Sequence, residues 1–73
     1  MIHLTSHSKI QIAVQPQDFR KQIDGLIAVT QHKLRCDPRS GTLFVFINRS
    51  RTMIRILCYR ENGYWIATMP SRS

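Results

Sequence analysis

The sequence predicts an α+β fold, a single domain with the order β-α-β-β-β in which one amphipathic helix packs on a mainly antiparallel sheet. Three observations predict it. Apolar residues alternate over residues 9–15, recur at helical spacing over residues 17–35, and then return in three strand-like runs separated by polar turns. With 73 residues, the chain is expected to form one small domain over residues 1–73, with its core at about 9–69 and flexible termini.

The first expected strand covers residues 9–15. Ile10, Ile12 and Val14 alternate there with polar or small residues, which is typical of a half-buried strand. Pro16 breaks the alternation, so the strand is expected to end before it.

The expected helix runs from about residue 17 to residue 35. One face of it carries Phe19, Ile23, Leu26, Ile27, Thr30 and Leu34. Asp18 lies near the positive N-terminal end of this helix, and Lys33 lies near its negative C-terminal end. Gly25 is the exception, because glycine costs roughly 1 kcal/mol in a helix interior. Close packing against a strand is one reason for a glycine there.

A break then separates the helix from the rest of the sheet. Asp37-Pro38 disfavours helical geometry, and Ser40-Gly41 supplies a flexible turn. Residues 42–48 follow as a strand that is apolar on both faces. These faces comprise Leu43, Val45 and Ile47 on one side and Phe44 and Phe46 on the other. Such a strand needs cover on both sides.

Two more strands complete the expected sheet, at residues 53–59 and 64–69. The polar segment 48–52 is expected to form the loop before the first of them. Residues 60–63 are expected to form the turn between them, because Asn62-Gly63 is a strong hairpin signal.

The chain is strongly basic, with eleven Lys and Arg against four Asp and Glu and a formal charge of +7. Arginine predominates, and its planar guanidinium suits phosphate recognition, so nucleic acid, expected to be DNA, is the favoured partner. The alternative is a solubilising surface charge. No apolar run approaches the ~20 residues that span a bilayer, so no membrane association is expected.

The arginines of the 48–52 loop are the main candidates for contact with nucleic acid. The expected binding residues are Arg20, Lys21, Arg49, Arg51 and Arg55. Arginines there could hold phosphates while Tyr59, Tyr64 or Trp65, on nearby strands, stacks on a base. The alternative is a solvated loop beside a core that contains Trp65.

Catalysis, metal and cofactor binding are not expected. The acids Asp18, Asp24, Asp37 and Glu61 all have structural explanations, such as pairing of Asp24 with Arg20. The pairs His3 with His7 and His32 with Cys36 are each too few to complete a zinc site. Cys36 and Cys58 are expected to be reduced thiols in a cytoplasmic protein, with Cys58 buried in a strand.

Three sequence blocks resemble a known family. They are the Asp-Phe-Arg-Lys-Gln-Ile-Asp-Gly-Leu segment at 18–26, the Asp-Pro-Arg-Ser-Gly-Thr-Leu-Phe-Val-Phe segment at 37–46, and Asn-Arg-Ser-Arg at 48–51 with the Ile-Arg-Ile-Leu and Asn-Gly segments that follow. Their order and spacing, over about residues 9–66, are similar to those of the second-reading-frame accessory protein of the insertion sequence 66 family. Family members continue with a Tyr-Lys-Arg-Leu-like segment where this chain has Ala67-Thr68-Met69-Pro70, so the resemblance implies a shortened relative.

The resemblance implies a bacterial mobile-element context, in which a separate transposase carries the chemistry and this protein assists. It supplies no catalytic residues. The sequence is therefore expected to encode a non-enzymatic transposition accessory protein that binds DNA or a transposase–DNA complex through its basic surface. The alternative is a protein-interaction module, or a self-associating remnant that forms a homodimer through its sheet, with no direct contact with nucleic acid.

Overall fold

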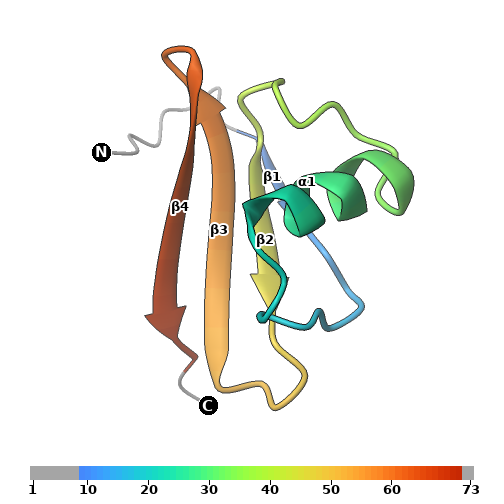
Figure 1. Ribbon diagram of the computed structural model, residues 1–73, viewed down its shortest axis with the longest axis vertical. Coiled ribbons are helices and arrows are strands. Elements are labelled where there is room, and N and C mark those ends of the chain that lie inside the picture. Colours follow the sequence, from blue (N-terminus) through green and yellow to red (C-terminus); the bar gives the residue numbers. More distant parts are fainter. Residues whose placement is uncertain (1–8, 72–73) are drawn as a thin grey trace.

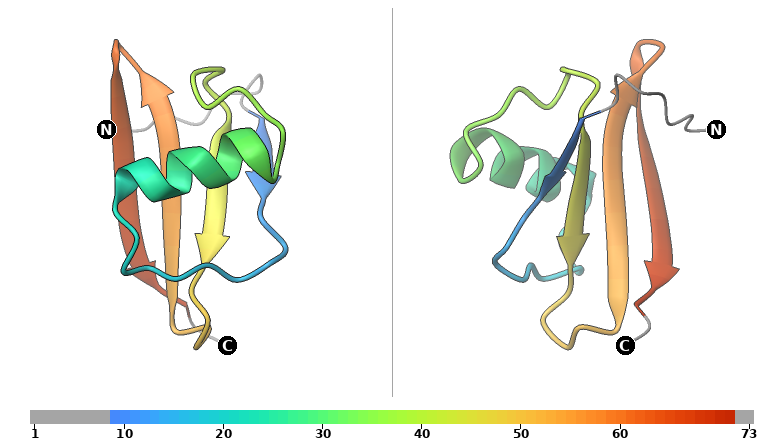
Figure 2. Two further views of the ribbon diagram at one scale, coloured as in Figure 1. Left: turned by 45° about the vertical axis from the view of Figure 1, so that its right-hand side comes forward. Right: turned by 180° about the vertical axis from the view of Figure 1, so that it is seen from behind.

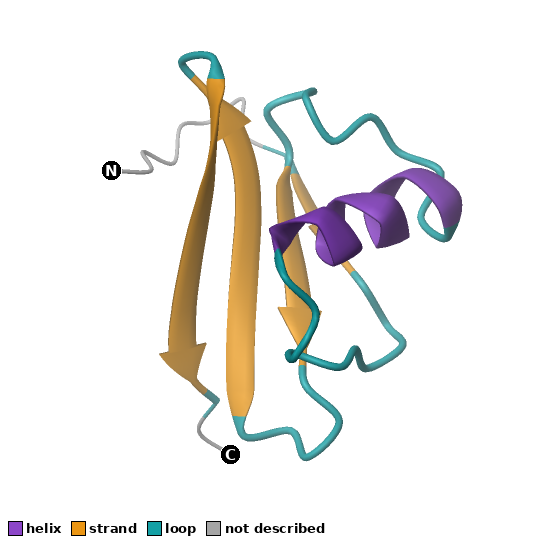
Figure 3. Cartoon of the chain, viewed as in Figure 1, coloured by secondary structure: helices purple, strands orange, loops and turns teal. Residues whose placement is uncertain are grey.

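The computed structural model describes residues 9–71, which form one helix and four strands (Figure 1). In chain order these elements are β1 (Ile10–Ile12), α1 (Ile23–His32), β2 (Leu43–Ile47), β3 (Met53–Arg60) and β4 (Gly63–Pro70). Figure 3 shows that long loops connect α1 to the strands on either side of it, whereas a tight turn connects β3 to β4. The expected order β-α-β-β-β is confirmed.

The four strands form one sheet in the order β1-β2-β3-β4. β1 runs parallel to β2, because the intervening helix carries the chain back before β2 begins, and the other two pairs are antiparallel. Helix α1 crosses one face of this sheet (Figure 2). The predicted α+β fold with a mainly antiparallel sheet is therefore confirmed.

The core lies between α1 and the face of the sheet that it covers. Phe44 and Phe46 of β2 are fully buried there with Leu57 of β3, against Leu26 and Val29 of the helix. Thr30, on the same helical face, is also fully buried, and its hydroxyl donates to the Leu26 carbonyl at 3.0 Å. Leu26 and Thr30 of the expected stripe are thus buried, together with Val29, which was not assigned to it, and the buried hydroxyl has a partner.

Helix α1 is shorter than the expected 17–35, and each end has a local cause. Before it, the Gln17 N–H donates to the Ile47 carbonyl at 2.9 Å and continues the parallel pairing instead of a helix. After it, Lys33 and Leu34 both donate to the Val29 carbonyl, and Arg35 adopts a left-handed backbone with a φ of 53°.

Gly25 also has a different neighbour from the expected strand. A Cβ atom added at Gly25 would lie 2.9 Å from the Cβ of Lys21, in the segment that leads into the helix. The glycine therefore makes room for that segment.

Strand β1 does not bury the residues that the alternation indicated. Ile10 and Ile12 are 57% and 62% exposed, Val14 is beyond the strand, and Ala13 is buried in the core instead. The small alanine fits beneath α1 next to β2, while the isoleucines project from the other face of the sheet. The half-buried strand expected over 9–15 is thus shorter, and its buried side is the reverse of the expected one.

The turns lie at the expected positions. Asp37 accepts a hydrogen bond from the Arg39 N–H at 2.9 Å, and Gly41 has a φ of 84°, which favours glycine. In the β3–β4 hairpin, the two residues with positive φ are Glu61 and Asn62, so the tight turn is one residue earlier than Asn62-Gly63 alone suggests.

Candidate nucleic-acid interface

Two loops meet at the end of β2 and form the candidate site. One is the segment 17–20 that leads toward α1, and the other is the β2–β3 loop, residues 48–52. They are joined by the bridge between Gln17 and Asn48, which extends the parallel β1–β2 pairing. Gln17 is only 4% exposed, and its side chain donates to the Gln15 carbonyl at 3.0 Å. Backbone pairing therefore places the first loop beside the second.

Asp18 and Arg20 form an ion pair in the first loop. Arg20 Nη2 and Nε lie 2.8 and 3.1 Å from Asp18 Oδ2, and the Arg20 backbone N–H donates to Oδ1 at 2.9 Å. These hydrogen bonds, with a smaller effect of the Arg49 charge, lower the pKa of Asp18 to about 2. The expected pairing of Arg20 with Asp24 is thus replaced by a pairing with Asp18. The Arg20 side chain stays 89% exposed.

Asn48 organises the second loop. Its side-chain Oδ1 accepts hydrogen bonds from the backbone N–H groups of Thr52 at 2.8 Å and Met53 at 3.0 Å, and its Nδ2 donates to the Thr52 hydroxyl at 3.0 Å. Within this frame Arg51 has a left-handed backbone, with a φ of 60°. Arg49 and Arg51 are both exposed. The loop therefore carries two exposed arginines on a backbone that the hydrogen bonds of one asparagine hold in place.

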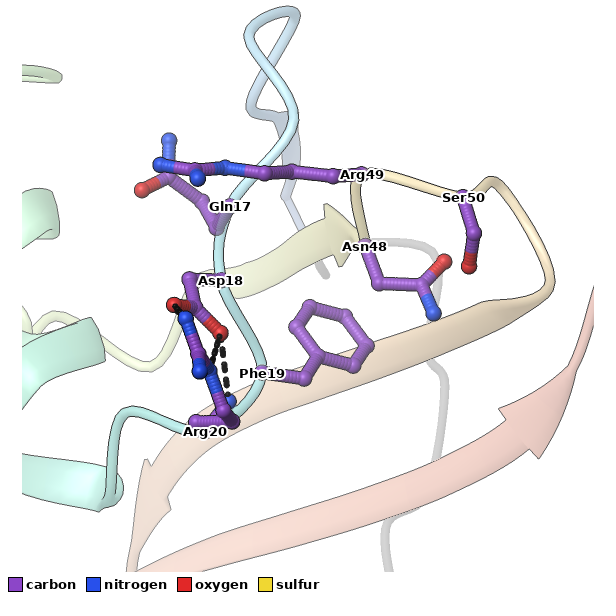
Figure 4. Close-up of a pocket in the computed structure, with 7 residues that line it drawn as sticks. All are labelled: Gln17, Asp18, Phe19, Arg20, Asn48, Arg49 and Ser50. Carbon is purple, nitrogen blue, oxygen red and sulfur yellow. Dashed lines mark hydrogen bonds and ion pairs between the residues drawn. The ribbon is translucent and has the colours of Figure 1, made fainter.

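The two loops enclose an open depression of about 450 Å³, shown in Figure 4. It is lined by Gln17, Asp18, Phe19, Arg20, Asn48, Arg49 and Ser50. The Arg49 side chain extends from its loop toward Gln17, and Asp18 and Arg20 face each other. We name Arg20, Arg49 and Arg51 together the basic end.

The structure brings some of the expected binding residues together and separates others. Arg20 and Arg49 line one depression, and Arg51 belongs to the same loop as Arg49. The Lys21 side chain lies beside Gly25 of α1 and lines a different depression. Arg55 has contacts within the domain. Its guanidinium lies 4.6 Å from the centre of the Phe19 ring, and it donates to the Phe19 carbonyl at 3.3 Å and the Thr68 hydroxyl at 3.1 Å.

The expected aromatic residues lie away from the basic end. Tyr59 and Tyr64 stack edge to face, with ring centres 4.9 Å apart, beside the β3–β4 turn at the other end of β3. Arg39 lies over the Tyr59 ring at 5.4 Å. Trp65 projects from β4 and is 41% exposed, so it is not part of the core that the alternative interpretation placed it in.

Two residues of the site were missed by the sequence analysis. Phe19 was assigned to the helical stripe, but it lies before the helix and lines the depression. Asn48 was treated only as a polar loop residue. A signal for it exists, because asparagine in a turn commonly forms hydrogen bonds from its side chain to nearby backbone groups.

Other sites that the sequence raised have no support in residues 9–71. No three His, Cys, Asp or Glu side chains of this part of the chain lie close enough together to hold a metal ion, and His3 and His7 lie outside it. Cys36 and Cys58 are free thiols, and Cys58 is buried as expected. Of the described residues, none forms a helix that is long and apolar enough to cross a bilayer.

Comparisons with known proteins agree with the resemblance of the three blocks. The family model described as IS66 Orf2 like protein matches residues 8–69. The uncharacterized protein y4jC of Sinorhizobium fredii (strain NBRC 101917 / NGR234) is 39% identical over 60 residues, which cover 82% of this chain and 51% of that protein. The chain thus spans about half the length of this relative. No solved structure matches the chain. A match over this much of the sequence shows that the chain belongs to the IS66 Orf2-like family of transposition accessory proteins.

Proposed function

We propose that this protein is a DNA-binding accessory factor of transposition that contacts the phosphate backbone through its basic end. The observation that carries the proposal is the meeting of Arg20 and Arg49 at one depression, with Arg51 in the same loop. Family membership supplies the transposition context. The contribution of this surface would be affinity and positioning rather than sequence recognition, because phosphate contacts carry no direct sequence information.

The geometry of the β2–β3 loop favours binding. Asn48 already orders the backbone on which Arg49 and Arg51 lie, so a ligand would not have to order that backbone itself. In the proposal Arg55 supports the site rather than contacting phosphate, because its guanidinium is held by Phe19 and Thr68.

Asp18 reduces the positive charge of the same surface. Its carboxylate holds the Arg20 guanidinium and offsets one positive charge at the depression. A phosphate that approaches Arg20 competes with this carboxylate. Binding is therefore expected to be weaker than the arginines alone would allow.

The direct test is a titration with labelled single- and double-stranded DNA and RNA between about 50 and 200 mM salt. The double variant Arg49→Ala/Arg51→Ala is expected to weaken binding to duplex DNA and to reduce the slope of log K against log salt by about 2. The matched control is Lys9→Ala/Lys33→Ala. It also removes two positive charges, but from exposed positions outside the basic end. The proposed site would be refuted if the two double variants lost the same affinity for duplex DNA. It would also be refuted if the wild type did not bind DNA at low salt.

Asp18→Asn tests the role of the ion pair. The asparagine Oδ1 can still accept from the Arg20 backbone N–H, but it no longer neutralises the guanidinium. Binding to duplex DNA is expected to become several-fold tighter at low salt. Asp24→Asn makes the same charge change at another exposed position. If the affinity for duplex DNA rises equally in both variants, the effect is due to net charge and not to the depression.

A second candidate function is a protein-interaction module. The observation that favours it is the face of the sheet opposite α1, over which no element of residues 9–71 lies (Figure 2). Ile10, Ile12 and Met69 are exposed at this face. Binding through it would be insensitive to salt, in contrast to phosphate binding.

A further inference from the structure

Two neighbouring rows of apolar side chains lie on the face of the sheet opposite α1, and a third row there, which contains Leu43 and Cys58, is buried at its centre. Strand register places its side chains in rows that cross the sheet, because residues that pair directly project to the same side. One row consists of Ile12, Val45, Ile56 and Ala67, and the next consists of Ile47, Ile54 and Met69. We name these two rows, with Ile10 and Trp65, the open face. None of these side chains is charged, and Arg60, which projects to the same side, lies at the end of β3 beside the turn.

The open face is also shaped to receive another surface. A depression of about 400 Å³ lies at its edge, where β1 ends, lined by Ile12, Ala13, Val14, Val45, Phe46, Ile47 and Ile54. Ile10 and Ile12 are more than half exposed, and Trp65 and Met69 are about two-fifths exposed. An apolar surface of this shape can interdigitate with a second sheet, as in packed β-sandwiches.

The open face is broad enough for a partner that has an extended surface of its own. Its exposed residues reach across all four strands, from Ile12 of β1 to Met69 of β4, and the neighbouring Val14 is 90% exposed. A standard interface buries about 800 Å² on each partner. A single peptide strand or a small ligand would leave much of this face in water.

The distribution of charge indicates which partner covers it. The chain carries +7, yet of the charged residues in the strands only Arg60 projects to this side of the sheet, at the β3–β4 turn and outside the two rows. A partner recognised through acidic groups would find no cation within the two rows to pair with. A second copy fits, because it brings the same uncharged area and can hold its cations outside the contact.

We propose that two copies of this chain pack open face against open face about a two-fold axis, with α1 on the outside of each sheet. The inference rests on the second of the two functions proposed above and is independent of DNA binding. Because the contact is apolar and the two copies are both positively charged, the dimer is expected to be as strong or stronger at high salt. DNA binding at the basic end has the opposite dependence on salt, so failure of one proposal is distinguishable from failure of the other.

The test is the molecular mass by sedimentation equilibrium over about 1–200 µM protein, a range in which an equilibrium between monomer and dimer shifts measurably. The wild type is expected to approach twice the 8.5 kDa of the monomer. Met69→Glu is expected to weaken the dimer at least tenfold. Ile66→Glu is the matched control, because Ile66 is 38% exposed and Met69 is 39% exposed on the same strand, but they project to opposite faces.

Ile12→Glu provides a second variant at the other edge of the sheet. Because Ile12 is 62% exposed, the monomer is expected to keep its fold, which circular dichroism checks. A wild type that stays monomeric at about 200 µM would overturn the proposal. So would equal losses in Met69→Glu and Ile66→Glu, since these would indicate pairing along the β4 edge, and so would a dimer that none of the three substitutions weakens.

Discussion

The two faces of strand β2 are both apolar, but their side chains are buried to very different extents. Phe44 and Phe46 on one face are completely buried beneath α1. Val45 and Ile47 on the other face are only partly buried, and a depression lies beside them. The comparison teaches that a strand apolar on both sides needs two covers, and that one helix supplies only one of them. The remaining face is the surface on which we propose that a second copy packs.

The largest difference between the faces is expected in Phe46→Ala and Val45→Ala. Removing the buried ring leaves a cavity under α1 and is expected to cost about 3–5 kcal/mol, whereas Val45→Ala removes a partly exposed side chain and is expected to cost about 1 kcal/mol. Urea unfolding at low protein concentration measures both. Similar costs would mean that the second face is covered within the monomer.

Adjacent residues of the β1 segment offer a sharper test of which side is inside. Ala13 is 4% exposed and Ile12 is 62% exposed, although the sequence indicates the opposite. Ala13→Leu is expected to overpack the core by about 1–3 kcal/mol, and Ile12→Thr to change the free energy of unfolding of the monomer by less than about 0.5 kcal/mol. Thermal unfolding of the two variants measures the difference. If Ile12→Thr is the more destabilising, the strand has the other register.

Arg55 extends the covered face beyond the end of α1. It pairs with Phe46 across the strands and holds Phe19 over the sheet. Arg55→Lys keeps the charge but loses the planar group and its hydrogen bonds, so a cost of about 1 kcal/mol is expected in urea unfolding. Arg55→Met is the control that keeps the apolar stem. A loss of DNA affinity in Arg55→Lys without a loss of stability would indicate that Arg55 contacts phosphate after all.

The smallest expected effect on stability comes from the ion pair between Asp18 and Arg20, in the segment before α1. Hydrogen bonds from Arg20 lower the pKa of Asp18 from its usual 3.8 to about 2. The pair therefore contributes its full stability above about pH 4 and loses it as the pH falls toward 2, since the unfolded carboxyl takes up its proton first. Asp18→Asn is expected to remove this part of the pH dependence, and the change is small because the pair is exposed. Unfolding curves of both proteins between these pH values measure it.

Much of the fold could be predicted because local patterns decided it. The apolar stripe from Ile23 to Leu34 specifies one helical face, and the runs around Phe44 and Leu57 specify strands in any compact arrangement. The helix boundaries were less predictable. Gln17 carries no strand signal, and it leaves the helix only because the end of β2 offers a carbonyl for its N–H.

The candidate site was predictable in residue type but not in arrangement. The sequence indicated the arginines around residues 48–52, and two of them are exposed in that loop. It could not show that Asp18 neutralises Arg20, that Arg55 is held by Phe19, or that Tyr59 lies at the other end of the sheet. These contacts depend on which loops lie side by side. Pairing between strands that are distant in the sequence determines this arrangement.

The sequence by itself determined the family, the order of the elements, the positive charge, and the apolar character of both sides of the 42–48 strand, because each is a local or compositional property. The tertiary structure alone decided which side the helix covers. Burying Phe44 and Phe46 under α1 fills the core with the two largest side chains of the strand, and the small Ala13 completes it. The isoleucines of β1 then have no place in that core, so they lie on the open face.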